Sequence, residues 1–140
     1  MKIYSDKWST RSINKTSSLM YIVAYPSTIR LNDEDFLAGV PNFLNNLRKH
    51  DPRYILLNLR GFQYTIVPEV QDWLVENFFP FVKSLGVEKI AIVTSLDTMS
   101  HLSVEQTIDE DEVTKSITQY FEGEKAARRW LLETSQHVRA

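Results

Sequence analysis

The chain has 140 residues, which suffices for one domain with a substantial core. Its 16 basic and 18 acidic residues give a formal net charge of −2, and no basic stripe is present that would neutralise a run of phosphates, so nucleic acid is not an expected partner. Cysteine is absent, which excludes disulfides, thiolate zinc sites and cysteine nucleophiles.

No segment of the sequence has the character of a targeting or membrane-spanning segment. A membrane span needs about 18 consecutive apolar residues, and no such run occurs. The first residues, MKIYSDKWSTRS, lack the apolar centre of a secretory signal. We therefore expect a cytoplasmic protein without a transmembrane segment, in keeping with the absence of cysteine.

The N-terminal residues predict a β-hairpin. SLMYIVAYP, residues 18–26, is a nearly continuous apolar run that ends at Pro26, which is typical of a buried strand. The segment from Ile3 to Ile13 is more polar, and NKTSS joins it to the apolar run. We expect it to form one edge strand that pairs antiparallel with residues 18–26.

A long helix is predicted after the hairpin. Asn32 fits its N-cap, and the acidic residues 33–35 place negative charge at the positive end of the helix dipole. Gly39 and Pro41 should kink or split this helix near its middle. It should end at HDPR, residues 50–53, because the residue before a proline is pushed away from helical angles.

The middle of the chain predicts two central strands with a helical segment between them. YILLNL, residues 54–59, and KIAIVTS, residues 89–95, are short apolar runs without alternation, as in strands covered on both faces. Pro68 suits the first turn of the intervening helix, and Pro80 should kink it. The expected sheet-facing stripe of this helix consists of Val70, Leu74, Phe78, Phe81 and Leu85.

The last third predicts helix, strand and helix. The segment from residue 100 begins like a helix capped by Ser103, and SITQYF, residues 116–121, alternates as a half-buried strand does. GEKAARRWLLETSQHV, residues 123–138, has the pattern of an amphipathic helix. Its apolar face contains Ala127, Trp130, Leu131, Thr134 and Val138.

Strands that alternate with helices imply right-handed βαβ crossovers and a largely parallel sheet. The opening hairpin makes that sheet mixed. The sequence therefore predicts a single α/β domain over residues 1–140, with a mixed, largely parallel sheet of four to five strands, an N-terminal β-hairpin and packed helices.

The order of several motifs resembles one known family. LNDEDF, YILLNLRGF, PEVQDWL with Pro68, Glu69, Gln71 and Trp73, EKIAIVTS and YFEGEKAARRWL follow one another along the chain. This order is similar to that of the STAS-like proteins related to anti-sigma-factor antagonists, also described as SpoIIAA-like or STAS/SEC14-like. The resemblance covers nearly the whole chain. It implies a regulatory or ligand-binding module rather than an enzyme.

The resemblance also bears on Thr65. The better-understood antagonists carry a serine in an Asp-Ser-Ser-Gly-like turn after the central strand, and its phosphorylation switches partner binding. This chain reads RGFQYT at residues 60–65, without an Asp-Ser pair, so that Thr65 offers the hydroxyl near the helix start. Thr65 is therefore a candidate phosphorylation site, but it also fits a helix N-cap, which is the favoured interpretation.

No catalytic or metal-binding motif stands out. Glycine-rich phosphate loops and a nucleophile elbow are absent from the sequence. His101 and Glu105 have i, i+4 spacing, but no further histidine or cysteine completes a metal site. The acidic run 109–112 lacks the spacing and the glycine of a calcium loop. We predict no cofactor, no metal and no enzymatic activity.

The segment after Pro68 carries more apolar side chains than one buried face needs. Val75, Phe79 and Val82 lie about 100° or more from the centre of the sheet-facing stripe, with Trp73 at its edge. Burial within the same chain is one interpretation, and a homodimer face or ligand groove is the other. The leading functional hypothesis is a non-enzymatic regulatory module that binds a protein partner or itself through this face.

The second hypothesis is a carrier or sensor of a small apolar or lipid ligand, as the SEC14-like side of the resemblance implies. Tyr64 and Trp73 would then line an apolar pocket. Arg60 and Gln71 are expected either to form the polar rim of such a groove or to satisfy backbone groups at the strand-to-helix turn. The turn itself follows the carboxyl end of a central strand, where open α/β sheets bind ligands.

Overall fold

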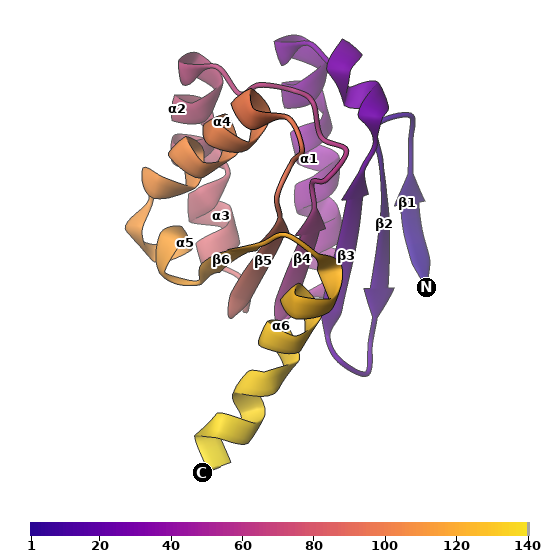
Figure 1. The fold of residues 1–140 in the computed structure, drawn as a ribbon, viewed down its shortest axis with the longest axis vertical. Coiled ribbons are helices and arrows are strands. Elements are labelled where there is room, and N and C mark those ends of the chain that lie inside the picture. The colour runs from indigo at the N-terminus through magenta and orange to yellow at the C-terminus, as the bar shows by residue number, and fades with distance from the viewer. Residues whose placement is uncertain (140) are drawn as a thin grey trace.

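One six-stranded mixed sheet organises the molecule (Figure 1). The computed structural model describes the backbone of residues 1–139 and the side chains of residues 1–133. The first three strands form an antiparallel meander, and the third to the sixth strands pair in parallel. The strands lie in sequence order in the sheet: β1 (Lys2–Ser5), β2 (Ser9–Asn14), β3 (Leu19–Ala24), β4 (Tyr54–Asn58), β5 (Lys89–Val93) and β6 (Thr118–Phe121).

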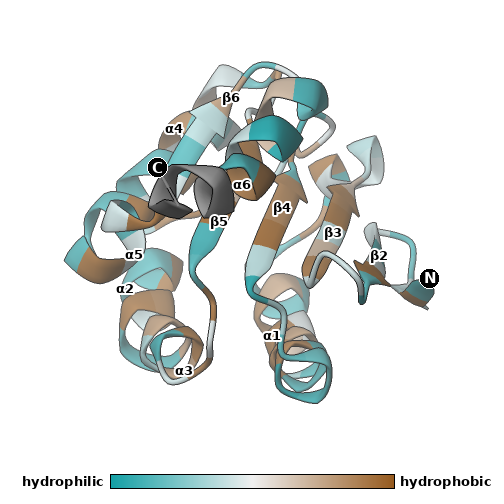
Figure 2. Ribbon diagram, turned by 90° about the horizontal axis from the view of Figure 1, so that it is seen from below, coloured by the Kyte–Doolittle hydropathy of each residue, from teal (hydrophilic) through white to brown (hydrophobic). Residues whose placement is uncertain are grey.

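Helices cover the two faces of the sheet unequally. α1 to α4 contribute side chains to the larger apolar cluster on one face, and α6 packs on the other face over β4, β5 and β6 (Figure 2). The helices are η1 (Pro26–Arg30), α1 (Asp33–His50), α2 (Pro68–Asn77), α3 (Phe79–Lys83), α4 (Thr98–Asp109), α5 (Glu112–Ser116) and α6 (Glu124–Arg139). None of the described helices combines the length and apolar character needed to cross a bilayer.

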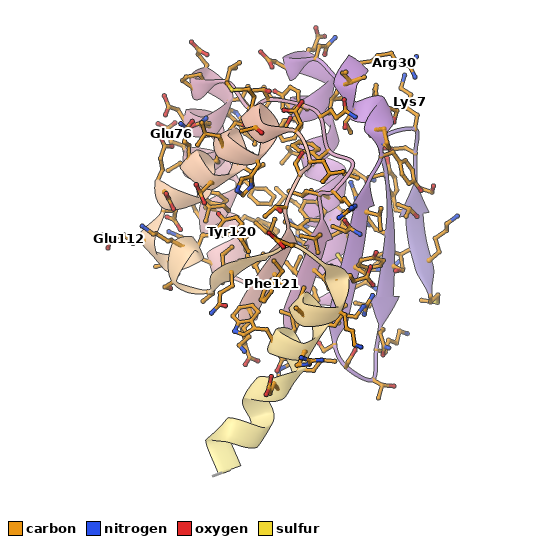
Figure 3. The ribbon with its side chains drawn as sticks, in the orientation of Figure 1. Lys7, Arg30, Glu76, Glu112, Tyr120 and Phe121 are labelled. Atoms are coloured by element: carbon orange, nitrogen blue, oxygen red, sulfur yellow. The ribbon has the colours of Figure 1, made fainter. Side chains whose placement is uncertain are left out.

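The strand alternation sorts side chains between these two faces. On β6, Tyr120 packs against the larger cluster and its neighbour Phe121 against the smaller one (Figure 3). The smaller cluster is closed tightly by α6, because Ala127 and Leu131 are completely buried against the sheet. The predicted face of this helix is therefore confirmed at these two positions. Thr134 and Val138, which were assigned to the same face, lie outside the residues whose side chains are described.

The mixed α/β sheet is confirmed, but the predicted strand count of four to five is wrong. The segment from Ile3 to Ile13 forms two strands instead of one. Asp6 causes the break, because its Oδ1 atom accepts hydrogen bonds from the backbone N–H groups of Trp8 at 2.7 Å and Ser9 at 2.9 Å. This side-chain turn reverses the chain and adds β1 as a new edge strand.

Helix α1 begins and ends where the sequence predicts, but it is not split. The Asn32 side chain accepts a hydrogen bond from Asp35 N at 2.7 Å, and Asp51 closes the C-terminus in the left-handed conformation with φ of 42°. Pro41 lies inside the continuous helix on its exposed side. A proline there removes one backbone hydrogen bond, and burial of Val40 and Leu47 keeps the helix on the sheet.

In the segment from Pro68 to Lys83, two of the three side chains of the predicted partner face are buried within the same chain, which was the other interpretation. The helix breaks at Phe78, and a second short helix restarts with Pro80 in its first turn. The break changes the direction of the following side chains. Phe79 is 4% exposed and Val82 is 5% exposed, so both lie in the core of their own chain, while Val75 is half-buried.

The start of α4 also differs from the prediction. Asp97 caps this helix by accepting a hydrogen bond from Ser100 N at 2.9 Å, so the helix begins before Ser103. Ser103 is buried inside the helix, and its hydroxyl accepts a hydrogen bond from Ile66 N at 2.9 Å. Ser103 of α4 therefore holds the long segment that runs from β4 to α2.

Two glycines give a matched test of this packing. A Cβ atom at Gly61 would lie 2.9 Å from the carbonyl oxygen of Ala24 and 3.1 Å from Cδ of Pro26, whereas one at Gly39 in α1 would meet nothing within 4 Å. We expect Gly61→Ala to lower the free energy of unfolding by about 1–3 kcal/mol through overpacking. Gly39→Ala should raise it by roughly 0.5–1 kcal/mol, because alanine favours a helix interior.

Urea unfolding of the two variants and the unchanged chain measures both effects. Equal stability of Gly61→Ala and the unchanged chain would contradict the close approach of residue 61 to β3.

Candidate ligand-binding site

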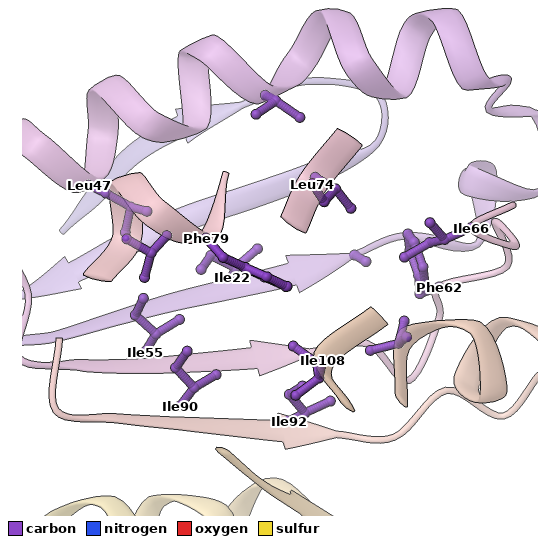
Figure 4. Packing of buried hydrophobic residues seen from close by; sticks show 14 of the residues in the cluster. Ile22, Leu47, Ile55, Phe62, Ile66, Leu74, Phe79, Ile90, Ile92 and Ile108 are labelled. Atoms are coloured by element: carbon purple, nitrogen blue, oxygen red, sulfur yellow. The ribbon is translucent and has the colours of Figure 1, made fainter. Parts of the chain in front are cut away.

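An apolar cavity of about 260 Å³ lies between the sheet and helices α1 to α4. The sheet contributes Ile22 and Ala24 from β3 and Leu57 from β4, and the segment after β4 adds Leu59, Phe62 and Ile66. Figure 4 labels six of the lining residues, which converge from the sheet, this segment and three helices. The helices contribute Phe36, Val40 and Phe43 of α1, Leu74 of α2, Phe79 of α3, and Val104, Thr107 and Ile108 of α4.

The cavity explains an unusual exposure in the centre of the sheet. Leu57 pairs with Ile22 on one side and Ile92 on the other, so it occupies a central position of a central strand. Ile92 is completely buried and Ile22 is 7% exposed, yet Leu57 is only half-buried. Its side chain is accessible because it lines the cavity. The space between sheet and helices is therefore not filled by the chain itself.

The less buried lining residues show where the cavity opens. Asp35 and Gly39 of α1 are exposed, and Asp6 and Trp8 in the turn between β1 and β2 are half-buried. The remaining lining residues from the strands and from α2 to α4 are buried or half-buried. The mouth therefore lies between the first half of α1 and the β1–β2 turn. Gly39 keeps this mouth free of a side chain.

Arg11 of β2 is the charged side chain buried in the cavity wall. It is 8% exposed, and its Nη1 atom donates hydrogen bonds to Oδ1 of Asn42 at 2.8 Å and of Asn46 at 2.7 Å. The guanidinium carbon lies 4.3 Å from the centre of the Tyr4 ring and 4.9 Å from that of Phe43. These contacts hold the group by two neutral amides and two aromatic faces.

The charge of Arg11 lacks a carboxylate partner among the described residues. The ion pairs of that part of the chain involve other residues, and the buried Nε atom of Arg11 makes no hydrogen bond. Burial is the main cause that lowers the pKa of Arg11, while Tyr4 and Asp6 act in the opposite direction. A guanidinium still remains protonated at neutral pH. A positive charge is thus embedded beside an apolar cavity.

The predicted polar rim does not form at the cavity. Arg60 is exposed, and Gln71 is buried with its Nε2 atom donating to the carbonyl oxygen of Ile66 at 2.9 Å. Gln71 thus satisfies a backbone group at the strand-to-helix turn, which was the structural alternative. Tyr64 is buried behind Phe36, with the two ring centres 4.7 Å apart, and does not line the cavity.

Tyr64 has a structural partner of its own. Its hydroxyl donates a hydrogen bond to Oδ1 of Asp33 at 2.6 Å. Burial and this carboxylate raise the pKa of Tyr64, so the side chain stays a neutral phenol. The pair ties the segment after β4 to the first turn of α1. Tyr64 therefore supports the cavity from outside its wall.

The remaining predicted site residues do not come together in one site. Trp73 is half-buried and lies outside the lining, and among the eight candidate residues it is Phe79 that lines the cavity. Thr65 is exposed and does not cap α2, because Val67 occupies the N-cap position without a side-chain hydrogen bond. The N-cap prediction for Thr65 is therefore wrong, and its phosphorylation stays a prediction.

Arg11 was missed at the sequence level, although a signal exists. Arg11 and Ile13 are two residues apart on β2, so they point to the same face of the sheet. Ile13 is 4% exposed in the larger core cluster, and the alternation carries Arg11 inward with it. Recognising the strand as inward-facing at Ile13 would have identified an inward-facing arginine.

A second polar cluster lies on the opposite face of the sheet. The Tyr21 hydroxyl donates to Oε2 of Glu124 at 2.7 Å and accepts from Nδ2 of Asn58 at 3.2 Å. Arg128 Nε donates to Oε1 of Glu124 at 2.8 Å. These groups satisfy one another and fasten the first turns of α6 to the sheet. Within the described residues, no group of three or more metal-ligating side chains is arranged to hold a metal ion.

This second cluster generates a pH prediction. Burial by itself would raise the pKa of Glu124, but hydrogen bonds from Tyr21 and Arg128 outweigh it, and the pKa lies below its usual value. A lowered pKa contributes stability above the ordinary glutamate pKa of about 4.3, and this stability is lost as the pH falls through the lowered pKa. We expect Glu124→Gln to be less stable than the unchanged chain at neutral pH.

The difference between the two proteins should shrink below about pH 4, because protonated Glu124 resembles glutamine. Urea unfolding at several pH values measures it, and Glu122→Gln on the neighbouring exposed loop is the matched control. A difference that does not change with pH would contradict the role assigned to the Glu124 carboxylate.

A comparison with protein-family models, curated proteins and solved structures finds no match. The STAS-like assignment therefore stays a prediction from sequence motifs, while the structure shows a mixed α/β fold. The cavity and the buried arginine in its wall are the features that bear on function.

Proposed function

We propose that the protein binds a small apolar ligand in the cavity between the sheet and helices α1 to α4. The observation that carries this proposal is the cavity itself, which has a volume of about 260 Å³ and an almost entirely apolar wall. Ligand pockets span roughly 300–1,000 Å³, so this one lies slightly below that range and suits a small ligand. Close-packed protein interiors leave few voids larger than a water molecule.

An unfilled apolar space of this kind lowers stability. Buried cavities cost about 24 cal/mol per Å³, so a closed void of similar size would cost on the order of several kcal/mol. A ligand that fills the space recovers this free energy only in the folded state. The mouth between α1 and the β1–β2 turn gives such a ligand a route of entry.

The dimensions of the cavity limit the size of the ligand. Taking roughly 30 Å³ for each water-sized group, the space accommodates about eight to ten non-hydrogen atoms. An alkyl chain of medium length or a small ring system has this size. Aliphatic and aromatic wall residues favour an apolar body for either.

The lining favours binding over catalysis. The hydroxyls of Thr28 and Thr107 both lie in the wall, but Thr28 donates to the carbonyl oxygen of Tyr25 at 2.7 Å and Thr107 to that of Ser103 at 2.7 Å. Both hydroxyls are thus occupied by backbone groups. We infer a carrier or sensor of the ligand, which was the second of the two hypotheses from the sequence.

The protein-interaction hypothesis ranks below this proposal. Its specific support was the face formed by Val75, Phe79 and Val82, and two of these side chains are buried in the core. Leu96, Met99 and Leu102 are exposed at and near the start of α4, at 72%, 61% and 42%. Exposed apolar residues are common on soluble proteins, so these three alone do not define a partner surface.

A substitution that fills the cavity tests the proposal. Ala24 lies in the wall and is 8% exposed, so leucine at this position would occupy part of the space that a ligand needs. We expect the unchanged protein to bind octanol, as measured by calorimetry, and to melt at a higher temperature in its presence. Ala24→Leu should bind octanol at least tenfold more weakly.

Ala126→Leu provides the matched control, since Ala126 is exposed on α6 and lies outside the cavity. This variant should bind octanol like the unchanged protein, and thermal melting of all three proteins reports whether they fold. Absence of octanol binding to the unchanged protein, or equal binding to a folded Ala24→Leu variant, would refute the proposed function.

A further inference from the structure

We propose that the ligand is an amphipathic anion, with an apolar body in the cavity and a carboxylate or similar acidic group paired with Arg11. This inference rests on the proposed function and names the chemical class of the ligand. It is carried by the juxtaposition of an apolar cavity with a buried arginine that has no carboxylate partner among the described residues.

The burial of Arg11 calls for a counter-ion. Removing a charge from water is costly unless the group is paired and hydrogen-bonded. The two amides and two aromatic rings that hold Arg11 are all neutral groups, which leave the net positive charge in place. An anionic group of a ligand would supply the opposite charge.

Two other arginines of the described chain do have a carboxylate partner. Arg53 pairs with Glu88, and Arg128 pairs with Glu124, although both arginines are much more exposed than Arg11. In these two pairs the carboxylate lies beside an arginine that water already stabilises. The most deeply buried of these three guanidinium groups is the one without a carboxylate.

The Arg11 guanidinium keeps hydrogen-bond donors that the chain does not use. Its hydrogen bonds to Asn42 and Asn46 both come from Nη1, so Nε and Nη2 make none with the described residues. Nε is fully enclosed by the chain, whereas Nη2 is not among the enclosed atoms. Nη2 is therefore the donor that a ligand carboxylate would meet in this structure.

The carboxylates near the mouth define the competing ligand class. Asp6 lies in the lining, but its oxygens accept hydrogen bonds from the Tyr4 hydroxyl at 2.8 Å and from the backbone of Trp8 and Ser9. Asp35 is exposed in the first turn of α1. These two charges would favour a cationic ligand, so a cation belongs among the probes.

A series of ligands with one chain length and three head groups tests the inference. Octanoate, octanol and octylammonium are titrated by calorimetry at neutral pH into the unchanged protein. We expect octanoate to bind at least tenfold more tightly than octanol, and octylammonium to bind more weakly than octanol. The Nε–H resonance of Arg11 should shift on addition of octanoate and not on addition of octanol.

Variants assign the preference to Arg11. Arg11→Met keeps much of the side-chain shape and removes the charge, so it should bind octanoate and octanol within about twofold of each other. Arg30→Met is the matched control, because Arg30 is exposed on η1 and lies outside the lining (Figure 3). It should keep the full preference for octanoate.

The outcomes separate this inference from the proposed function. Equal affinities of the unchanged protein for octanoate and octanol, or tightest binding of octylammonium, would overturn the anionic ligand and leave the apolar cavity site standing. Binding of none of the three probes would overturn both. A preference for octanoate that persists in Arg11→Met would overturn the role of Arg11. If Arg11→Met does not fold, the head-group series and the Nε–H shift in the unchanged protein decide.

Discussion

A guanidinium group buried without a carboxylate at ion-pair distance among the described residues is the constraint around which the first face of the sheet is arranged. Arg11 reaches inward from β2, and α1 meets it with two asparagines and the ring of Phe43. These contacts bind α1, the helix of the crossover between the parallel strands β3 and β4, to the antiparallel strand β2. The same contacts place a positive charge at the edge of an apolar cavity. Packing thus depends on this side chain, and so does the ligand recognition that we propose.

The two faces of the sheet differ in how completely they are filled. On one face, Ala127 and Leu131 of α6 fit against β4 and β5 without exposed area. On the other face, four helices surround a space that Leu57 reaches and does not fill. One face of the sheet is thus tightly packed, and the other contains an open space. An apolar void of this kind lowers the stability of the folded state. We attribute its retention to a ligand.

Local signals in the sequence predicted much of the fold. Asn32 capped its helix and Pro68 began the next one, because both effects depend on hydrogen bonds within a single turn. The helical periodicity failed beyond Phe78, since the break before Pro80 changed the direction of Phe79 and Val82. A pattern extended across such a break assigns side chains to the wrong face.

The candidate site was harder to predict than the fold. Arg11 meets Asn42 and Asn46 across separations of 31 and 35 residues, so its burial depends on tertiary packing that no local motif records. The cavity is a volume left between elements, and its size follows from how far apart the helices stand. Phe79 is the predicted candidate residue that lines the cavity. It was assigned to a face away from the sheet-facing stripe, but its side chain is buried in the core.

The most direct test of the central claim is to locate a bound amphipathic anion by NMR. With unlabelled octanoate and a protein labelled at the methyl groups, we expect intermolecular NOEs from the alkyl chain to Ile22, Leu57 and Ile108, which line the cavity from two strands and α4. Saturable binding without NOEs to these three residues, or no binding of octanoate at all, would contradict this claim.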